Sequence, residues 1–271
     1  MADDNDQDFT GFQVLRLHYT ADPEKFTPEH IAKLKSDTPT EDWEREFELK
    51  PVGHMGNYPV YGDYKKQLHE STSLQYNPVL KQLVRGWDFG KVHPCVEVIQ
   101  VDGLKKDVIG EVFGTQIYLH QFVQQVLEYS NKNFPNAKFV DWVDATGKNE
   151  RDNGFSSINV LRQYGIKPRW RMQDIEEGVD LIKHELIRII EGRPQLMFNP
   201  QKCPKLCEAM RGGYQRDKKG KVIKDGTHDH APDAFRYGMS GILTGAARAK
   251  TDFYSKIKDY KYKPNNPFTG R

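Results

Sequence analysis

The chain has 271 residues, of which 37% are hydrophobic and 29% are charged, and its formal net charge is +2, as in an ordinary soluble globular protein. It contains no run of about 18 apolar residues, and its start, MADDNDQDF, lacks a basic region and an apolar segment, so we expect neither a membrane span nor a secretory signal. Three cysteines, an odd number in a long chain, argue against a disulfide framework and favour a reducing, cytoplasmic compartment.

Residues 1–80 carry few apolar periods and several helix breakers, and we treat them as an N-terminal extension. Two short helices are predicted within them. TPEHIAKLKS, residues 27–36, has Thr27 in place to cap a helix and Pro28 at its first turn, and PTEDWEREFELK, residues 39–50, forms the second.

From residue 81 the pattern changes to strands. KQLVRGWDFG, CVEVIQVDG and DVIGEVFG, residues 81–90, 95–103 and 107–114, are three short apolar segments with turn signals between them. Because the connections are this short, we expect an antiparallel meander.

Helices and strands then alternate. The helix-like segments are residues 117–134, 156–165 and 174–192, and the strand-like ones are 137–147, 166–172 and 195–200. GYQRDKKGKVIKDG, residues 213–226, is typical of a β-hairpin with Lys219 and Gly220 in the turn. Residues 81–245 are therefore predicted to form an α/β domain around a mixed sheet.

Two aspartates end predicted strands. In LVRGWDFG the two-residue period places Asp88 on the same face as Val84 and Gly86, and Arg85 on the other. In AKFVDWVDATG the same rule separates Asp144 from Asp141. A carboxylate at the end of an apolar strand is costly to desolvate unless a cation compensates it. The alternative for each is a turn-forming or helix-capping aspartate.

A third acidic stretch is THDHAPDAFRY, residues 227–237. Apolar residues from Phe235 onward follow a helical period, so a helix should begin near Pro232. Asp233 lies off the apolar stripe, near small residues that would let the helix approach the sheet closely. Asp229 is placed to cap this helix.

Three carboxylates from two strand ends and one helix start suit a pair of Mg²⁺ or Mn²⁺ ions, which prefer oxygen ligands. Such pairs activate a water molecule and stabilise the leaving oxygen of a phosphodiester. Positive charge also clusters in the 211–224 segment and after Gly245, and local basic patches attract phosphates, although a solvated loop and a flexible tail (residues 246–271) would give the same pattern.

The order GWDFG, FVDWVDATG, CPKLCEAMRGGYQRD and HDHAPDAFRYG resembles the nuclease domain of the large terminase subunit of tailed bacteriophages, over residues 81–245. The resemblance implies an RNase H-like fold and two-metal cleavage of concatemeric double-stranded viral DNA. It assigns the metal ligands Asp88, Asp144 and Asp233, with Asp88 shared between the ions. Asp229 matches an acidic position that is often followed by a second acid, where this chain has His230.

The same resemblance implies further partners. These are double-stranded DNA, a terminase ATPase domain or subunit, the small terminase and the portal protein, met in the host cell cytoplasm and transiently at the procapsid. The hairpin would lie beside the nuclease groove, which makes Lys218, Lys219 and Lys221 predicted phosphate contacts. The segment before residue 81 resembles the link between the family's ATPase and nuclease.

The chain lacks a P-loop, because its Gly-Lys pairs are followed by Val, Asn and Val rather than Ser or Thr. We therefore expect no ATPase activity, and either a separated nuclease portion or a naturally separate subunit. Alternative interpretations are an actin-like ATPase, another RNase H-like nuclease such as a resolvase or transposase, and a non-catalytic DNA-binding or motor-assembly module. Cys203 and Cys207 with His228 and His230 lack the spacing of a usual zinc site, and Cys207 fits a helix that faces the core.

Overall fold

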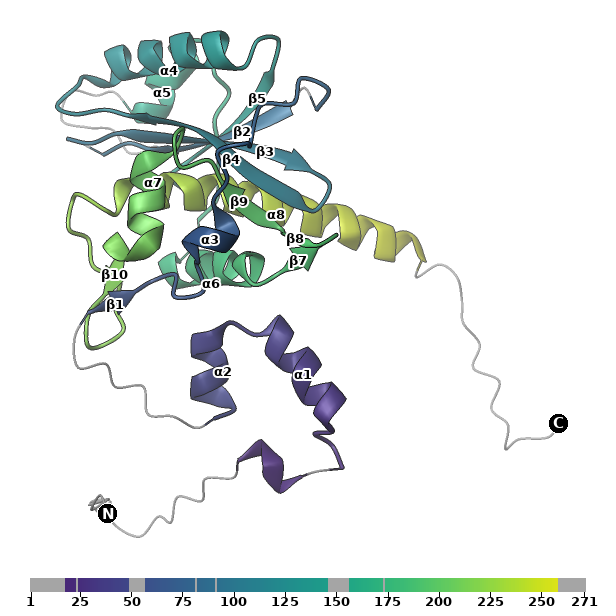
Figure 1. Ribbon diagram of the computed structural model, residues 1–271. Helices are drawn as coiled ribbons and strands as arrows, with labels where there is room; N and C mark the ends of the chain where they lie inside the picture. The colour runs from purple at the N-terminus through teal and green to yellow at the C-terminus, as the bar shows by residue number, and fades with distance from the viewer. Residues whose placement is uncertain are drawn as a thin grey trace.

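A six-stranded mixed sheet forms the centre of the protein (Figure 1). The computed structural model describes residues 18–257, apart from 23, 49–56, 81, 91, 146–155 and 173. The spatial order of the strands is β6-β5-β2-β3-β4-β9. Their bounds are β2 Gln82–Asp88, β3 Cys95–Asp102, β4 Lys105–Phe113, β5 Lys138–Val143, β6 Arg169–Trp170 and β9 Leu196–Phe198.

The strand directions confirm the predicted meander. Strands β2, β3 and β4 pair antiparallel, whereas β5 runs parallel to β2, β6 parallel to β5 and β9 parallel to β4. Trp87 of β2 lies opposite Val143 of β5. Because parallel strands end at the same edge, the next residues, Asp88 and Asp144, come out together there.

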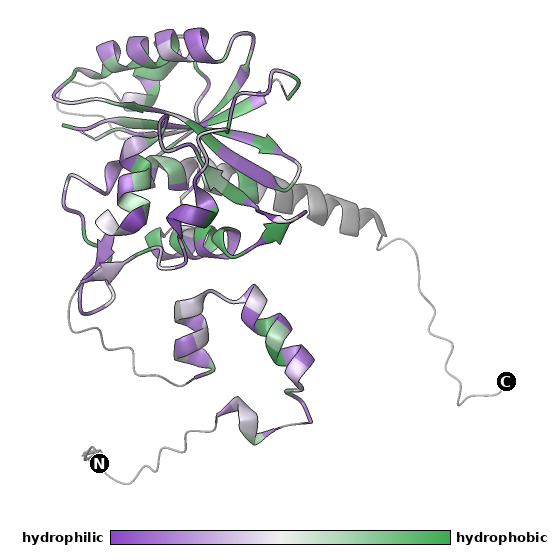
Figure 2. Ribbon diagram, in the orientation of Figure 1, coloured by the Kyte–Doolittle hydropathy of each residue, from purple (hydrophilic) through white to green (hydrophobic). Residues whose placement is uncertain are grey.

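One face of the sheet is covered by α4 (Leu119–Asn133) and α5 (Ser157–Gln163). The α4 residues that face the sheet, Phe122, Val123 and Val126, are fully buried, and the mixed purple and green of this helix in Figure 2 reflects its one-sided burial. On the same face, Arg85 is buried and donates to both carboxylate oxygens of Asp141, at 2.7 and 3.1 Å. Strand parity thus placed both residues correctly, away from Asp88.

The opposite face is covered by α6 (Ile175–Leu186), α7 (Pro204–Glu208), the π-helical turn Ala209–Gly213 that continues it, and α8 (His230–Ile257). Phe235 and Met239 of α8 are buried against the sheet. A Cβ atom on Gly86 would overlap the Ala234 carbonyl oxygen and lie 2.7 Å from the Gly238 amide nitrogen. The predicted close approach between this helix and the central strand is therefore real, and it depends on glycine.

The N-terminal part contains a short 3-10 turn (Tyr19–Ala21), α1 (Pro28–Asp37), α2 (Thr40–Glu46), β1 (Tyr58–Pro59) and α3 (Lys66–His69). Thr27 caps α1 as predicted, since its hydroxyl accepts from the His30 amide at 3.3 Å. Val60 and Tyr61 are buried in the same core as α8. Part of the segment before residue 81 thus packs into the sheet body, and the division at residue 80 stays a prediction.

Two small hairpins decorate the sheet. Strand β10 (Gln215–Arg216) bridges back to Val222, which places a hairpin inside the predicted 213–226 segment, and it also pairs with β1. The second hairpin, β7 (Ile189–Ile190) with β8 (Arg193–Pro194), corrects the predicted helix 174–192, which ends at Leu186. The backbone turns at Glu191 and Gly192, whose φ angles are 51° and 77°, and a helix cannot continue through such residues.

Across the described ranges, no helix is both long enough and apolar enough to cross a membrane. The first part of the predicted flexible tail, residues 246–257, instead continues α8, and residues 258–271 lie outside the described ranges.

Candidate functional site

The end of the central strand and the start of α8 meet at one point. Asp88 is the last residue of β2, and its Oδ2 lies 2.7 Å from Nδ1 of His230, the first residue of α8. The side chains of Asp88 and His230 are 14% and 17% exposed. This contact brings the predicted acidic strand end and the acidic helix start into one site.

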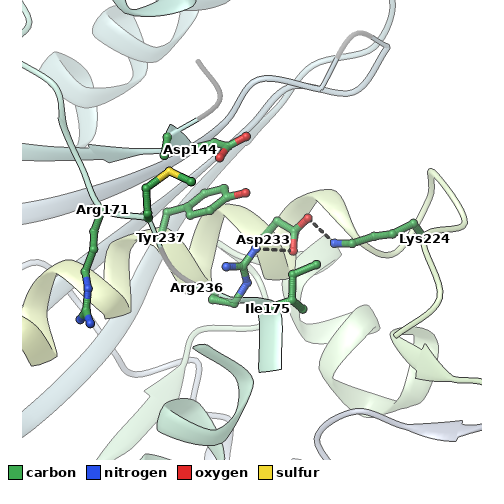
Figure 3. A pocket seen from close by; sticks show the side chains of 9 residues that line it. Asp144, Arg171, Ile175, Lys224, Asp233, Arg236 and Tyr237 are labelled. Atoms are coloured by element: carbon green, nitrogen blue, oxygen red, sulfur yellow. Dashed lines mark hydrogen bonds and ion pairs between the residues drawn. The ribbon is translucent and has the colours of Figure 1, made fainter. Parts of the chain in front are cut away.

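Asp233, in the first turn of α8, is held by three donors, two of which, Lys224 and Arg236, are drawn in Figure 3. Lys224 forms an ion pair with its Oδ2, while Oδ1 accepts from Arg236 Nη2 at 3.2 Å and from the Tyr214 hydroxyl at 3.4 Å. Arg236 is nearly fully buried, and Lys224 is 37% exposed. Arg236 is therefore fixed within α8, whereas Lys224 reaches Asp233 from the segment before the helix.

Asp144 faces Asp233 across a pocket of about 310 Å³ (Figure 3). The pocket wall combines acidic, basic and apolar side chains. Its described lining residues are Asp144, Ala145, Arg171, Met172, Ile175, Lys224, Asp233, Arg236 and Tyr237. A cleft with acids on two sides and cations beside them can hold an ionic ligand.

Tyr237 lines the same pocket as Asp144 and Asp233 (Figure 3). Burial raises the pKa of its phenol, and the negative charges of Asp233, Asp144 and Asp88 raise it further against the opposing effect of Arg236. The phenol therefore stays protonated at neutral pH and can donate a hydrogen bond. Its surroundings show that the three acids share one electrostatic environment.

The acids also influence one another. Burial raises the pKa of Asp88, the charge of Asp233 adds to this, and the hydrogen bond from His230 opposes it. The pKa of His230 is raised in turn, chiefly by its hydrogen bond to Asp88. Negative charges that crowd a poorly solvated site repel one another, and a bound cation would offset this repulsion.

Asp229 directly precedes α8, in the position predicted for a helix cap, and its backbone oxygen accepts from the Asp233 amide at 3.0 Å. The helix begins at His230, two residues before the predicted Pro232. Asp229 is 7% exposed, and within the part of the chain that the structure describes its Oδ1 is buried without a hydrogen-bond partner. Such an oxygen is costly to bury unless something binds it.

The predicted donors fit a hard divalent cation in chemistry, since all are carboxylate oxygens. Among the described residues, however, no three or more His, Cys, Asp or Glu side chains lie close enough together to hold a metal ion. Side chains contact two of these carboxylates instead: His230 pairs with Asp88, and Lys224 and Arg236 pair with Asp233. The metal-ligand roles of Asp88, Asp144, Asp233 and Asp229 stay predictions.

The hairpin lysines, His93 and two buried cysteines lie outside the group of acids described above. Lys218, Lys219 and Lys221 are exposed in and beside the turn of the β10 hairpin, and their predicted DNA contacts remain untested. His93 stacks on Phe113 and lies 5.8 Å from the His230 ring, centroid to centroid. Cys203 and Cys207 are buried in the core, as a core helix predicts.

Sequence reasoning missed the cations that hold Asp233. Arg236 follows it by three residues on one helix, a spacing that favours side-chain contact and could have been noticed. Lys224 was counted only within a basic segment, and its contact depends on how that segment folds back onto α8.

Comparisons at the sequence level are silent, because neither a family model nor a curated protein matches the chain. Among solved structures, the chain is similar to the large terminase from the thermophilic bacteriophage D6E, with 16% identity and a TM-score of 0.63 over 80% of this chain and 53% of that one. The ADP complex of the same protein gives a TM-score of 0.64. The P22 large terminase nuclease domain gives 16% identity and a TM-score of 0.50, covering 69% of this chain and 92% of that domain.

The fold is that of a phage large terminase nuclease domain. The predicted RNase H-like mixed sheet with flanking helices and an added hairpin is thereby confirmed. The chain spans about half the length of the D6E large terminase that it matches. At this identity the terminase likeness establishes the fold, and activity and partners are matters for proposal.

Proposed function

We propose that this chain is a metal-dependent endonuclease that cuts concatemeric double-stranded viral DNA during genome packaging. The observation that carries the proposal is that Asp144 and Asp233 line one pocket and that Asp88 ends the neighbouring strand, at one edge of a sheet with the terminase nuclease fold. In a fold that hosts nucleases, acids gathered at strand ends support chemistry at that edge.

Asp88, Asp144 and Asp233 would hold two Mg²⁺ or Mn²⁺ ions, with Asp229 as a further ligand. The unpartnered Asp229 oxygen and the mutual influence of Asp88 and Asp233 both support a place for added positive charge. Bound divalent ions of this kind lower the pKa of a water molecule and stabilise the leaving oxygen of a phosphodiester.

The protein's own residues supply the rest. Arg236 keeps Asp233 oriented from within the same helix, and the protonated Tyr237 offers a donor beside the acids. The exposed Lys218, Lys219 and Lys221 would bind the DNA backbone. Phosphate contacts position DNA without reading its sequence, so cleavage should show weak sequence preference.

The terminase fold also supports partners that this chain would need. Large terminases with an ATPase portion power packaging, and this chain spans about half of one. We therefore propose that it works with an ATPase domain or subunit, the small terminase and the portal protein, in the host cytoplasm. A resolvase-like or transposase-like nuclease would share the same chemistry on other DNA, and a non-catalytic module would use the acids structurally.

The direct test is plasmid cleavage with Mn²⁺. Asp88→Asn keeps the size of the side chain but removes its charge, and we expect it to abolish cleavage. Asp102→Asn makes the same change at an exposed position of β3 and should cleave like the wild type. Circular dichroism and thermal melting verify that both variants fold. Full cleavage by Asp88→Asn would refute the assignment.

A further inference from the structure

The Lys224 ammonium lies where added positive charge would be expected in the proposed metal site. It pairs with Oδ2 of Asp233, and both residues line the pocket that Asp144 faces (Figure 3). In Figure 3 Lys224 and Arg236 approach Asp233 from different sides, and the two cations hold different oxygens of the carboxylate. Asp233 therefore carries one counter-ion on each oxygen.

Of these two cations, only Lys224 can move away from Asp233 without disturbing α8. The Arg236 guanidinium is 4% exposed and belongs to the same helix as Asp233, so it cannot move away without disturbing α8. The Lys224 side chain is 37% exposed and enters from the segment between β10 and α8. A half-exposed lysine changes its conformation at little cost, because its stem is flexible and water can solvate its head.

The segment around Lys224 keeps its shape without the ion pair. On one side, Asp217 accepts from the backbone amides of Lys219 and Lys221, both at 2.9 Å. On the other side, Asp225 accepts from the amides of Thr227 and His228, at 2.8 and 2.7 Å. Lys224 thus lies between two turns that are stabilised by their own hydrogen bonds, and its side chain can change conformation without unfolding either turn.

In the same position, the Lys224 ammonium also contacts Tyr214. The Lys224 Nζ atom is 3.3 Å from the Tyr214 hydroxyl and 5.5 Å from the centroid of the Tyr214 ring. Tyr214 is itself buried. A cation that loses its carboxylate partner could keep part of its stabilisation by resting on this aromatic face.

We propose that Lys224 is an exchangeable counter-ion of Asp233: its ammonium holds the carboxylate when no metal is bound, and it gives up Oδ2 when a divalent cation binds. The inference rests on the proposed function, because it takes Asp233 to be a ligand. The physical reason is that an ammonium and a divalent cation on one carboxylate oxygen repel each other strongly in a poorly solvated site. Lys224 is a positioning residue, and it keeps Asp233 in place for an incoming ion.

The main experiment measures Mn²⁺ affinity by isothermal titration calorimetry without DNA, so that no catalytic activity enters the result. Lys224→Met keeps the length of the stem and removes the competing charge, and we expect about tenfold tighter Mn²⁺ binding than in the wild type. Lys221→Met removes the same charge from the same segment and should change the Mn²⁺ affinity much less. Unchanged or weaker binding by Lys224→Met would overturn the exchange.

A second variant covers the case in which Lys224→Met does not fold. Lys224→Arg keeps the charge and can hold both oxygens of a carboxylate, so it should compete better and weaken Mn²⁺ binding. Binding by Lys224→Arg that is as tight as in the wild type would count against the exchange.

Metal-free unfolding gives an independent measurement. In EDTA, Lys224→Met should lower the free energy of unfolding, and the loss should vanish in an Asp233→Asn background, where no carboxylate is left to pair. A loss of the same size in both backgrounds would contradict the counter-ion role.

The titrations also separate the two proposals. If the wild type binds Mn²⁺, Asp233→Asn loses it and Lys224→Met equals the wild type, the exchange alone fails. If the wild type binds no Mn²⁺, the proposed metal-dependent function fails, and the exchange fails with it.

Discussion

The imidazole of His230 is hydrogen-bonded through Nδ1 to Oδ2 of Asp88, at 2.7 Å, and so ties the first residue of α8 to the last residue of β2. The pKa of His230 is raised above its ordinary 6.5, chiefly by this hydrogen bond, and burial raises the pKa of Asp88 above 3.8. In the folded protein these two groups hold protons that they release in the unfolded chain, so their contribution to stability falls as the pH rises through their titration ranges.

The first prediction concerns this pH dependence. The stabilisation from His230 is fully present below its unfolded pKa of 6.5 and is lost as the pH rises through its higher folded pKa. His230→Gln removes the titrating group, so its stability deficit relative to the wild type should be largest below that pH and should shrink above it. Urea unfolding in EDTA at a series of pH values measures this. A deficit that grows with pH would contradict the assigned direction.

The second prediction concerns the contact between β2 and α8. Gly86→Ala places a methyl group against backbone atoms of Ala234 and Gly238, which cannot move independently of the helix. We expect a loss of about 3 kcal/mol or more in the free energy of unfolding. Gly62→Ala is the matched control, because a Cβ there meets no atom within 4 Å and its φ is not positive. Equal stability of the two variants would disprove the close approach.

The third prediction concerns the buried ion pair on the other face of the sheet. Asp141→Ala leaves the Arg85 guanidinium buried without its carboxylate, and it should cost about 3–5 kcal/mol of folding free energy. Glu177→Ala breaks the exposed pair with Arg171, whose side chains are 48% and 41% exposed. That change should cost less than about 1 kcal/mol. Chemical denaturation of both variants makes the comparison, and similar losses would show that burial does not govern the pair.

The fourth prediction concerns DNA binding by the β10 hairpin. Replacing Lys218, Lys219 and Lys221 together with alanine should weaken binding to duplex DNA and lower the salt dependence of the affinity by about one unit of slope per lysine that contacts a phosphate. Fluorescence anisotropy over a range of salt concentrations, with EDTA present, measures both. The control replaces three exposed lysines of α1, α4 and β5 (Lys33, Lys132 and Lys138). Equal effects of the two triple variants would show that only net charge matters.

Much of the fold follows from local patterns. Short apolar segments with tight turns specify the β2-β3-β4 meander, and the two-residue period of β2 and β5 separates Asp88 from Arg85 and Asp144 from Asp141. The predicted helix 174–192 was too long because its pattern stays apolar through Ile189 and Ile190. Those residues instead form β7, which a turn at Glu191 and Gly192 pairs with β8. Periodicity alone does not mark where a short apolar run changes from helix to strand.

The acidic residues of the site could be predicted from the sequence, but the cationic side chains that contact them could not. An aspartate at a strand end is visible in one short segment, whereas the contact between Lys224 and Asp233 depends on the path of the eight residues between them. The His230 contact with Asp88 joins residues 142 positions apart. Such pairs are set by tertiary packing, which a single sequence does not encode in any local period.

The glycine contact between β2 and α8 fixes one part of this site and leaves another part able to adjust. Asp88 and Asp233 sit on two elements that touch backbone to backbone, so a tightly packed contact sets their separation. The chain between β10 and α8, which carries Lys224 and Asp229, could then supply the adjustment needed during a reaction cycle. Substitutions in that segment could change how readily the carboxylates become accessible to a ligand, while the distance between Asp88 and Asp233 stays constant.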